Sequence, residues 1–413
     1  MNIYEEALKL HKKYRGKLEI NVKVPCDTNE DLALAYTPGV GAVCLEIEKD
    51  KENAYIYTNK GNTIGVISDG SAVLGLGNIG AQAALPVMEG KALLMKKFAN
   101  LDAIPLCINT NDVEEIIRVC KLLEPNLAGI NLEDISAPRC IEIERRLIQE
   151  MNIPVFHDDQ HGTAIVVLAT LINCLKLINK KPKECKVVIS GTGAAGNSTI
   201  RMLYNYGFTN IYAFDRNGLL SNKKLDKYDK YKKELLNYVN LDNKEYNSLK
   251  EGLVKADIFI GVSAKGLVDI DMVKSMNEKN VVLALANPEP EISYDDAKKA
   301  GAFIVGTGRS DRPNQVNNLL AFPGLLRGVL NARATKITEE MKIASSIAIA
   351  SLINEEELNT DYVIASPLDK RVVERVSKAV EEVALWKSIK QWWLIYMRLQ
   401  WLKLILMIRH LIK

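Results

Sequence analysis

The chain has 413 residues, enough for two or three ordinary domains, and its 47% hydrophobic and 25% charged residues are typical of folded globular proteins. These values argue against a disordered chain, a collagen-like chain and a polytopic membrane protein. Lys and Arg total 54 against 51 for Asp and Glu, a balance that gives no reason to expect nucleic acid as a partner. The segment from Trp386 to Lys413 contains six basic residues and no acid, so the body before it is net acidic.

The cysteines and the start of the chain indicate the compartment. The seven cysteines form no CxxC pair and lie in apolar or helix-like stretches, which favours buried thiols over a disulfide framework. The first 20 residues mix acidic and basic side chains and contain no uninterrupted apolar run, so we expect no secretory signal. The sequence therefore predicts a cytoplasmic protein.

Residues 1–160 alternate short apolar runs with helical patterns. Apolar runs at 63–68, 103–108 and 127–131 are typical of strands. Over 112–123, apolar residues recur at the spacing of one helix face. The sequence therefore predicts an N-terminal α/β domain.

A second α/β domain is predicted for residues 161–385. It begins with an apolar helix over 161–179, and the Lys- and Asn-rich stretch 221–250 is expected to be a solvated insertion. Strands that alternate with helices predict a doubly wound parallel sheet of the Rossmann type. The expected strands lie at 185–190, 210–215, 257–262, 281–286 and 302–305.

A glycine-rich loop follows the expected strand at 185–190 and precedes an apolar-periodic helix. We expect its first glycine to permit the turn, its second to admit a pyrophosphate and its third to let the helix pack on the sheet. Asp215 ends the next strand, where it would accept ribose hydroxyls and oppose a 2′-phosphate. This placement favours NAD over NADP, although the neighbouring Arg216 supplies the opposite charge. The loop consists of Gly191, Thr192, Gly193, Ala194, Ala195 and Gly196.

A second glycine pattern, at 75–80, matches the same motif. The next acid is Glu89, which comes before any second strand can form. We therefore interpret this cluster as a packing loop or a substrate loop rather than a dinucleotide site.

Two apolar runs end in carboxylates. Because ligands gather at the carboxyl ends of parallel strands, three carboxylates from two such ends suit Mg²⁺ or Mn²⁺, and solvated helix caps are the alternative interpretation. His157 and His161 are four residues apart, but without a third soft ligand we expect structural hydrogen bonds from them rather than a zinc site. The four carboxylates from which such a set of three can be drawn are Glu133 and Asp134 in the first run and Asp158 and Asp159 in the second.

Several further motifs occur in a fixed order along the chain. They are Ala35–Val40, Ser68–Gly77, Glu89–Lys91, Asn131–Asp134, Phe156–Thr163, Asn287-Pro288 and Asn314–Gly324. Together these motifs resemble those of the small prokaryotic malic enzymes. The resemblance covers roughly residues 15–384. It implies an N-terminal malic domain and an enzyme that converts L-malate to pyruvate and CO₂ with NAD(P)⁺ and Mg²⁺ or Mn²⁺, and that also decarboxylates oxaloacetate. It further implies a homodimer to whose interface the N-terminal segment contributes.

The resemblance also implies residue roles. It places the metal ligands on Glu133, Asp134 and Asp159, the general base on Lys91 and the general acid on Tyr36. Lys91 would take the C2 hydroxyl proton of malate, which requires a pKa below its ordinary value of about 10.4. Tyr36 would protonate C3 after CO₂ leaves, with the metal acting as a Lewis acid. The remaining roles are Asp158 as a candidate for holding Lys91, Asn287 as a cofactor and substrate contact, and Lys91, Asn317 and Asn318 as substrate contacts.

Two features depart from the family. Larger eukaryotic relatives carry an arginine after the Asp-Gly pair, where this chain has Ser71-Ala72-Val73, so asparagines, backbone amides or the metal must bind the substrate carboxylate. Residues 386–413 hold all four tryptophans and resemble nothing in the family. Three interpretations of this tail remain open: a translated frameshift, a packed or partner-binding helix, and an interfacial membrane helix. A transmembrane span is a poor fit because charged residues interrupt a short apolar run.

Two other functions remain open. A malolactic-type or oxaloacetate-decarboxylating enzyme would share the metal site and the lysine, and net formation of reduced nicotinamide separates it from a malic enzyme. A non-catalytic, cofactor-sensing Rossmann protein is a rival of another class. The joint presence of the residues assigned to metal, base and acid argues against that second rival.

Overall fold

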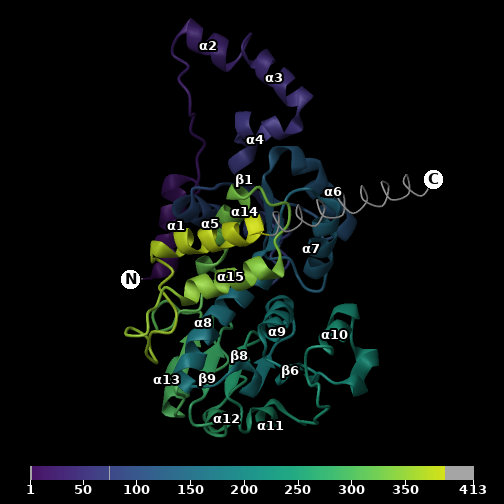
Figure 1. Ribbon diagram of the computed structural model, residues 1–413, viewed down its shortest axis with the longest axis vertical. Coiled ribbons are helices and arrows are strands. Elements are labelled where there is room, and N and C mark those ends of the chain that lie inside the picture. The colour runs from purple at the N-terminus through teal and green to yellow at the C-terminus, as the bar shows by residue number, and fades with distance from the viewer. Residues whose placement is uncertain (1, 74, 387–413) are drawn as a thin grey trace, which may run out of the picture.

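The computed structural model describes residues 2–73 and 75–386. The interpretation of the tail lies outside the described residues, except for Trp386, which is in a helix that begins at residue 371. Figure 1 shows two α/β lobes along the long axis and an N-terminal arm that projects from the far end of the first lobe.

The first lobe holds a four-stranded parallel sheet with the order β2-β1-β3-β4. Its strands are β1 (Thr63–Ser68), β2 (Asp102–Cys107), β3 (Gly129–Leu132) and β4 (Val155–His157). Alternate side chains of β1 point to opposite faces, as the period of a strand requires. Ile64 and Val66 join the core that includes Met88 of α5 (Ala81–Ala99). Ile67 joins the core formed by α6 (Val113–Leu123) and α7 (Arg139–Glu150), so helices cover both faces.

The second lobe holds a six-stranded sheet with the order β10-β9-β8-β5-β6-β7. All its neighbouring strands are parallel except β7, which pairs antiparallel with β6. Helix α9 (Ala194–Tyr206) packs on one face, and α11 (Leu249–Leu253), α12 (Ile270–Lys274) and α13 (Tyr294–Lys299) pack on the other. The expected doubly wound sheet is confirmed. The strands are β5 (Val187–Ser190), β6 (Ile211–Asp215), β7 (Gly218–Leu219), β8 (Ile258–Gly261), β9 (Val281–Ala284) and β10 (Ile304–Thr307).

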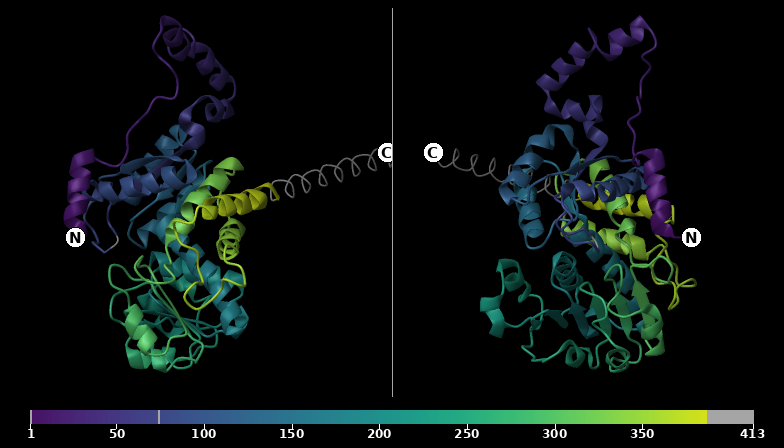
Figure 2. Two further views of the ribbon diagram at one scale, coloured as in Figure 1. Left: turned by 90° about the vertical axis from the view of Figure 1, so that its left-hand side faces the viewer. Right: turned by 180° about the vertical axis from the view of Figure 1, so that it is seen from behind.

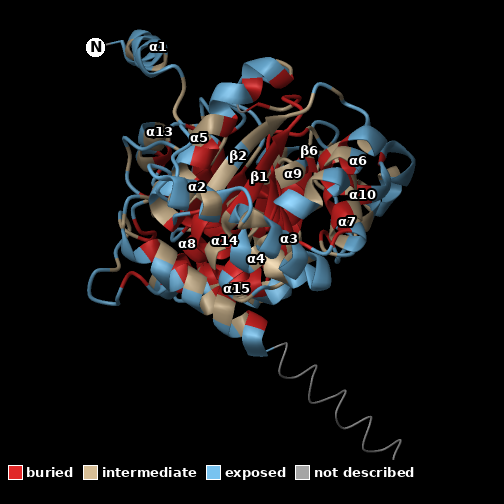
Figure 3. Cartoon of the chain, turned by 90° about the horizontal axis from the view of Figure 1, so that it is seen from above, coloured by how far each residue is buried: buried red, intermediate tan, exposed pale blue. Residues whose placement is uncertain are grey.

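The two lobes share a core around helix α8 (Thr163–Ile178), which packs against α9 and α15 (Glu339–Ala350). The segment that contains α8 is long and apolar enough to cross a membrane, but 72% of its most apolar window is buried inside the protein, as in a core helix. Helix α14 (Phe322–Asn331) returns to the first lobe and packs on α5. Figure 3 shows the buried residues concentrated on the strands and their covering helices. The domain boundary at residue 160 stays a prediction.

The stretch 221–250 is mostly exposed, as its composition predicts, but part of it packs into the core. It contains helix α10 (Lys230–Leu235), whose Tyr231 and Leu235 are buried. Glu234 of the same helix pairs with Arg145 of α7 at 2.8 Å. Apolar residues spaced by about one helical turn give this polar stretch a buried face, and this periodicity decides its packing.

The N-terminal arm spans residues 18–62 and contains α2 (Asn29–Ala35), α3 (Val40–Lys49) and α4 (Ala54–Tyr57), and it follows helix α1 (Ile3–Tyr14). No residue of these four helices is buried. The described cysteines are all free thiols, and the expectation of buried thiols is wrong for Cys26 and Cys44, because both are exposed on this arm. Figure 2 shows the arm standing away from the sheet in two further views.

Candidate functional site

The acidic residues gather at one edge of the first sheet. Glu133 and Asp134 follow β3, and Asp159 lies in the π-helical turn Asp158–Gly162 between β4 and α8. Because β3 and β4 are parallel neighbours, their carboxyl ends meet, and oxygen atoms of the three side chains lie within 4.8 Å of one another. The backbone N–H of Asp134 donates to Oδ2 of Asp159 at 2.8 Å. Asp134 has a φ of +54°, a left-handed conformation uncommon for a non-glycine residue and typical of functional sites.

Lys91 joins this cluster from the middle of α5. Its Nζ lies 2.8 Å from Oε1 of Glu133 and 2.7 Å from Oδ2 of Asp158, and the residue is only 9% exposed. The same Oδ2 accepts a hydrogen bond of 2.6 Å from Nδ2 of Asn318. The ammonium also lies 4.5 Å from the ring centroid of Phe322 at the start of α14. Asp158, the candidate for holding Lys91, thus contacts the amine, and residues distant in sequence surround this pair.

The charges of this cluster are unbalanced. Burial lowers the pKa of Lys91, but the carboxylates of Asp158, Glu133 and Asp159 outweigh burial and raise that pKa above its ordinary value. Burial raises the pKa of Glu133 and of Asp158 to about 7 each, and that of Asp159 to about 6. The described protein groups thus do not supply the depressed lysine pKa that a general base needs, because acids outnumber the ammonium. Such a cluster favours an additional cation.

A hydrogen-bonded brace supports the loop that carries Glu133 and Asp134. Nη1 of Arg139 donates to Oδ2 of Asp69 at 2.9 Å. The backbone N–H of Ser136 donates to Oγ of Ser71 at 2.9 Å, and the carbonyl of Asp134 accepts from the backbone of the residue after Ser71 at 2.9 Å. The segment after β1 and the segment after β3 are therefore joined by hydrogen bonds, which set the position of Glu133 and Asp134.

The two histidines behave differently. Nε2 of His161 lies 3.0 Å from Oε2 of the buried Glu144, and Nζ of Lys342 lies 3.1 Å from its Nδ1, so the expected structural role of His161 is confirmed. The backbone N–H of His157 donates to Glu144 at 3.0 Å, but neither ring nitrogen of His157 has a hydrogen-bond partner among the described residues. Burial lowers the pKa of His157 to about 4, so its ring is neutral. The expectation of hydrogen bonds from this ring is not met.

The glycine-rich loop has the geometry that its residue types predict. Gly191 has a φ of +108°, and a Cβ there would lie 2.5 Å from the carbonyl oxygen of Val262. A Cβ on Gly193 would meet no atom within 4 Å, so this position is open to a ligand. A Cβ on Gly196 would collide with the carbonyl oxygen of Gly191, because α9 packs closely against the sheet. Helix α9 begins directly after Gly193, with its free N–H groups beside this opening.

Asp215 ends β6, as expected for the acid of a dinucleotide site, but its carboxylate is already engaged. Oδ2 accepts from Nζ of Lys232 on α10 at 2.7 Å, and Oδ1 accepts from the backbone N–H of Asn217 at 2.7 Å. The cation beside Asp215 is therefore Lys232, which the sequence reasoning missed in favour of Arg216. The signal that could have found it is the helical spacing of Tyr231 and Leu235, whose burial gives α10 an inward face.

Of the other residues with predicted roles, some lie near Lys91 and the acidic cluster and others do not. Asn287 follows β9, and a Cβ on Gly75 would lie 3.1 Å from Cδ of Pro288, so the 75–80 glycine loop meets the Asn287-Pro288 loop of the other lobe. Asn318 contacts Asp158, whereas Oδ1 of Asn317 caps its own turn by accepting from the backbone of Leu319 at 2.9 Å. Tyr36 is not with them: it follows α2 on the arm and is 66% exposed.

Comparisons with known proteins agree with this geometry. The family models for the malic enzyme N-terminal domain and the malic enzyme NAD binding domain match residues 15–148 and 160–385. The chain is 54% identical to a bifunctional malic/malolactic enzyme of Bacillus subtilis, over 93% of this chain and 94% of that protein. It is 50% identical to an NAD-dependent malic enzyme of Geobacillus stearothermophilus, over 93% and 79% of the two chains. The crystal structure of an NAD-dependent malic enzyme from Thermotoga maritima superimposes with a TM-score of 0.88 at 47% identity, covering 91% of this chain and 98% of that one.

Proposed function

This chain belongs to the malic enzyme family, and from that premise we propose which of its residues carry the reaction. It is an NAD(P)-dependent oxidoreductase that oxidatively decarboxylates malate. The observation that carries the residue assignment is the buried ammonium of Lys91, held 2.7 Å from Asp158 and 2.8 Å from Glu133 at the acidic edge of the first sheet.

We propose that Glu133, Asp134 and Asp159 hold a divalent cation. The three carboxylates are hard oxygen donors within 4.8 Å of one another, and no cysteine belongs to the cluster, which fits Mg²⁺ or Mn²⁺ better than zinc. The raised pKa values of Glu133 and Asp159 support this assignment, because they report acids without enough positive charge nearby. A cation held there would supply Lewis-acid polarisation of the substrate.

We assign the proton at the malate C2 hydroxyl to Lys91. The hydride leaves C2 for the nicotinamide while the hydroxyl proton passes to the amine, and a neutral amine is required to receive it. A cation held by Glu133 and Asp159 would offset two of the carboxylates that raise the pKa of Lys91, and burial lowers that pKa. Asp158 and Asn318 position the amine, because Oδ2 of Asp158 accepts a hydrogen bond from Lys91 and a second one from Asn318.

Loss of CO₂ from the resulting oxaloacetate leaves the enolate of pyruvate, which takes a proton at C3. We assign that proton to Tyr36, on the strength of the family motif Ala35–Val40. Asn287 lies where the loops of the two lobes meet, and with Asn318 it is suited to bind the substrate carboxylate. This chain has Ser71-Ala72-Val73 where larger relatives carry an arginine, so we assign binding of the substrate carboxylate to these amides.

The paired Asp215 and Lys232 support use of both nicotinamide cofactors. The carboxylate oxygens can accept ribose hydroxyls, and the lysine can contact a 2′-phosphate. A salt bridge of 2.7 Å leaves this corner of the site close to neutral. We therefore propose that NADP⁺ is accepted beside NAD⁺.

A malolactic activity is a second candidate, favoured by the 54% identity to a protein named a bifunctional malic/malolactic enzyme. Both reactions share the oxidation and decarboxylation steps. They differ in whether reduced nicotinamide leaves or returns its hydride to the keto carbon of pyruvate. The same acidic edge and Lys91 serve either outcome.

Initial rates with L-malate and Mn²⁺ test the proposal, measured by near-ultraviolet absorbance with NAD⁺ or NADP⁺ in the presence and absence of EDTA. Pyruvate and lactate are assayed in the same samples. We expect EDTA-sensitive formation of pyruvate in step with reduced cofactor, and lactate without net reduction would favour the malolactic candidate. Lys91→Ala should abolish turnover and leave cofactor binding intact. A Lys91→Ala protein that still turns over malate would remove the assignment of Lys91 as the base. A folded wild-type protein that forms neither pyruvate nor lactate would favour a cofactor-sensing protein.

A further inference from the structure

Glu291 is a fully buried acid that the mechanism above does not use. It follows β9 and the Asn287-Pro288 loop in the second lobe. Its Oε1 accepts from the backbone N–H of Ser263 at 2.8 Å and from Oγ of the same serine at 3.2 Å. Its Oε2 accepts from the backbone N–H of Ala286 at 3.1 Å. One carboxylate therefore joins the loop after β8 to the loop after β9.

The residues around this carboxylate leave room for it. Gly261 ends β8, and a Cβ there would lie 2.3 Å from Cδ of Glu291. Any side chain at this position would therefore displace the carboxyl group. The backbone is paired as well, because the N–H of Val268 donates to the carbonyl of Glu291 at 3.1 Å and the N–H of Gly266 donates to the carbonyl of Pro290 at 3.2 Å. The loop after β8 and the segment 290–291 are thus closely fitted.

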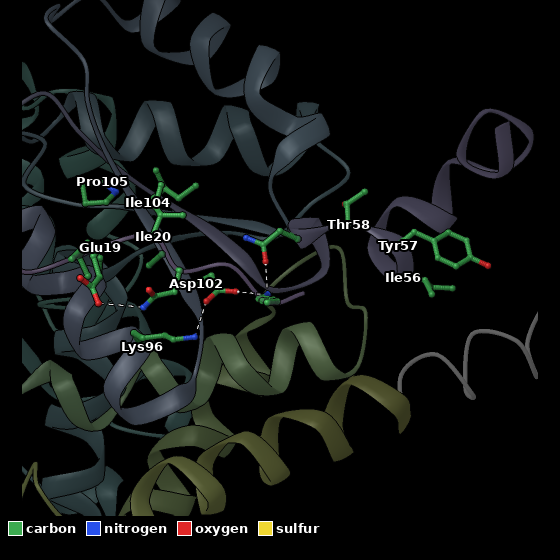
Figure 4. Close-up of a pocket in the computed structure, with 15 residues that line it drawn as sticks. Glu19, Ile20, Ile56, Tyr57, Thr58, Lys96, Asp102, Ile104 and Pro105 are labelled. Carbon is green, nitrogen blue, oxygen red and sulfur yellow. Dashed lines mark hydrogen bonds and ion pairs between the residues drawn. The ribbon is translucent and has the colours of Figure 1, made fainter. Parts of the chain in front are cut away.

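Glu291 also differs from the paired acids of this protein. Asp102 lines a cavity of about 850 Å³ beside β2, and Figure 4 shows Lys96 next to it, with Nζ 2.8 Å from Oδ1. No ion pair among the described residues includes Glu291. Burial raises the pKa of Glu291, and the backbone N–H groups of Ser263 and Ala286 oppose that rise. Because an acid buried without a counter-charge lowers stability, its hydrogen bonds point to a role other than stability.

The first loop that Glu291 holds lies against the glycine-rich loop. Oγ of Ser190, the last residue of β5, lies 2.9 Å from Oγ of Ser263. Because Ser263 donates its hydroxyl hydrogen to Glu291, Ser190 donates to Ser263. Gly191 comes next, and a Cβ there would lie 3.2 Å from Cβ of Ser263. Strands β5 and β8 are neighbours at which the strand order reverses, and this is where parallel sheets bind dinucleotides.

The second loop that Glu291 holds carries Asn287. Ala286 donates its N–H to the carboxylate and directly precedes Asn287. A Cβ on Gly308, which follows β10, would lie 2.8 Å from Nδ2 of Asn287, so the amide lies between the ends of β9 and β10. The position of Asn287 relative to the glycine-rich loop therefore depends on the bridge that Glu291 makes.

We propose that Glu291 is a positioning residue for hydride transfer, because its carboxylate sets the loop that carries Asn287 relative to the glycine-rich loop. The inference rests on the proposed role of Asn287 as a cofactor and substrate contact. The pyrophosphate and the adenine ribose are assigned to the glycine-rich loop and to Asp215, which lie on the other side of the bridge. Loss of the bridge therefore affects the alignment of nicotinamide and malate more than the affinity for the cofactor, since small misplacements of reacting atoms strongly reduce rates.

Glu291→Gln tests this role at nearly constant shape. The amide has one oxygen, so its NH₂ group faces one of the two backbone N–H donors and that half of the bridge opens. We expect kcat for malate oxidation with NAD⁺ to fall about 10-fold to 100-fold, while the Kd for NAD⁺ measured by calorimetry rises less than about threefold. The isotope effect on kcat with malate deuterated at C2 should increase, because hydride transfer becomes slower relative to the other steps. Glu289→Gln is the matched control, with an exposed side chain on the same loop, and should match wild type in all three measurements.

Two further variants separate charge from reach and keep the test independent of folding. Glu291→Asp keeps the charge, but its shorter side chain reaches only one loop, so the same loss of kcat is expected. Ser263→Ala keeps both backbone donors and removes only the hydroxyl between Glu291 and Ser190. It is therefore expected to fold in every case, to lose at least about threefold in kcat and to raise the isotope effect.

A purely structural role gives a different pattern. The Glu291 variants would then unfold at lower temperature, but the folded enzymes and Ser263→Ala would keep the kcat and the isotope effect of wild type, and the proposal is refuted. Asn287→Ala is measured beside them and is expected to lose activity. Full activity in Asn287→Ala would remove the proposed role of Asn287, whereas its loss together with an unchanged Glu291→Gln protein would remove the positioning role alone. The two failures are therefore distinguishable.

Discussion

Replacing Lys232 by alanine should change the cofactor preference of this enzyme. Its Nζ lies 2.7 Å from Asp215, whose side chain is 8% exposed against 24% for the lysine. In the wild type the pair is close to neutral. In the variant the carboxylate keeps its charge, because the backbone N–H of Asn217 still donates to it. A 2′-phosphate then meets a buried negative charge and loses a cationic partner.

The size of the effect can be worked out from these contacts. A hydrogen bond to a charged group contributes about 1.5–3 kcal/mol. At about 1.4 kcal/mol per factor of ten, this corresponds to a loss of roughly 10-fold to 150-fold in kcat/KM for NADP⁺. The value for NAD⁺ should stay within about threefold, because the freed Oδ2 can accept a ribose hydroxyl. The ratio of the two efficiencies therefore shifts strongly toward NAD⁺.

The assay is the initial rate of cofactor reduction at saturating malate and Mn²⁺, with each cofactor varied in turn. Lys233→Ala is the matched control, because Lys233 lies on the same helix with an exposed side chain. We expect the control to leave the ratio of efficiencies unchanged. If Lys232→Ala also leaves that ratio within threefold of wild type, the 2′-position of the ribose does not lie at the Asp215–Lys232 pair and the reasoning is wrong.

Three other outcomes are expected. The pKa values of Glu133 and Asp159 are raised to about 7 and about 6, so both acids hold protons at pH 5.5 that a cation must displace. The Kd for Mn²⁺ measured by calorimetry should therefore rise at least about tenfold between pH 7.5 and pH 5.5. A constant Kd contradicts the ligand assignment. Asp158→Asn removes a carboxylate that raises the pKa of Lys91, so the acid limb of the kcat/KM profile should move to lower pH by about 1–3 units, and an unmoved limb would exclude Lys91 as the titrating base. Ending the chain after Leu385, where the family match also ends, should leave the specific activity unchanged and increase solubility, whereas loss of folding would show that the tail is a structural part of the protein.

Local patterns in the sequence predicted most strands of both sheets, although not the short antiparallel strand β7, and the strand ends at which the acidic residues lie. The helix predicted for 112–123 is α6, and the expected strand at 185–190 is β5. The roles of Gly191, Gly193 and Gly196 were also readable, because turn geometry and close helix packing depend on residue type at short range. The two acidic runs were placed at strand ends for the same reason, whereas the structure shows that the two strands are neighbours. Periodicity and turn chemistry are properties of a few consecutive residues.

The environment of Lys91 was decided only by the tertiary structure. Asn318 reaches Asp158 across 160 positions of sequence. The carboxylates of three nearby acids outweigh burial and raise the pKa of Lys91, which the sequence analysis expected to be lowered. The pairing of Lys232 with Asp215 depends in the same way on how α10 packs. Ionisation depends on which charges share a desolvated space, and no local pattern encodes that.

Tyr36 shows most clearly the difference between what a sequence motif predicts and what the tertiary structure decides. Its motif identified the residue, but the motif carries no information on the end of the sheet from which the arm departs. The direction of β1 and the anchoring of Glu52 and Tyr55 by Arg333 set that end. The sequence alone supplied the residues that we propose for metal, base and acid. Chain topology decided which of them meet within one chain, because a parallel strand places the residues before it and the residues after it at opposite ends of the sheet.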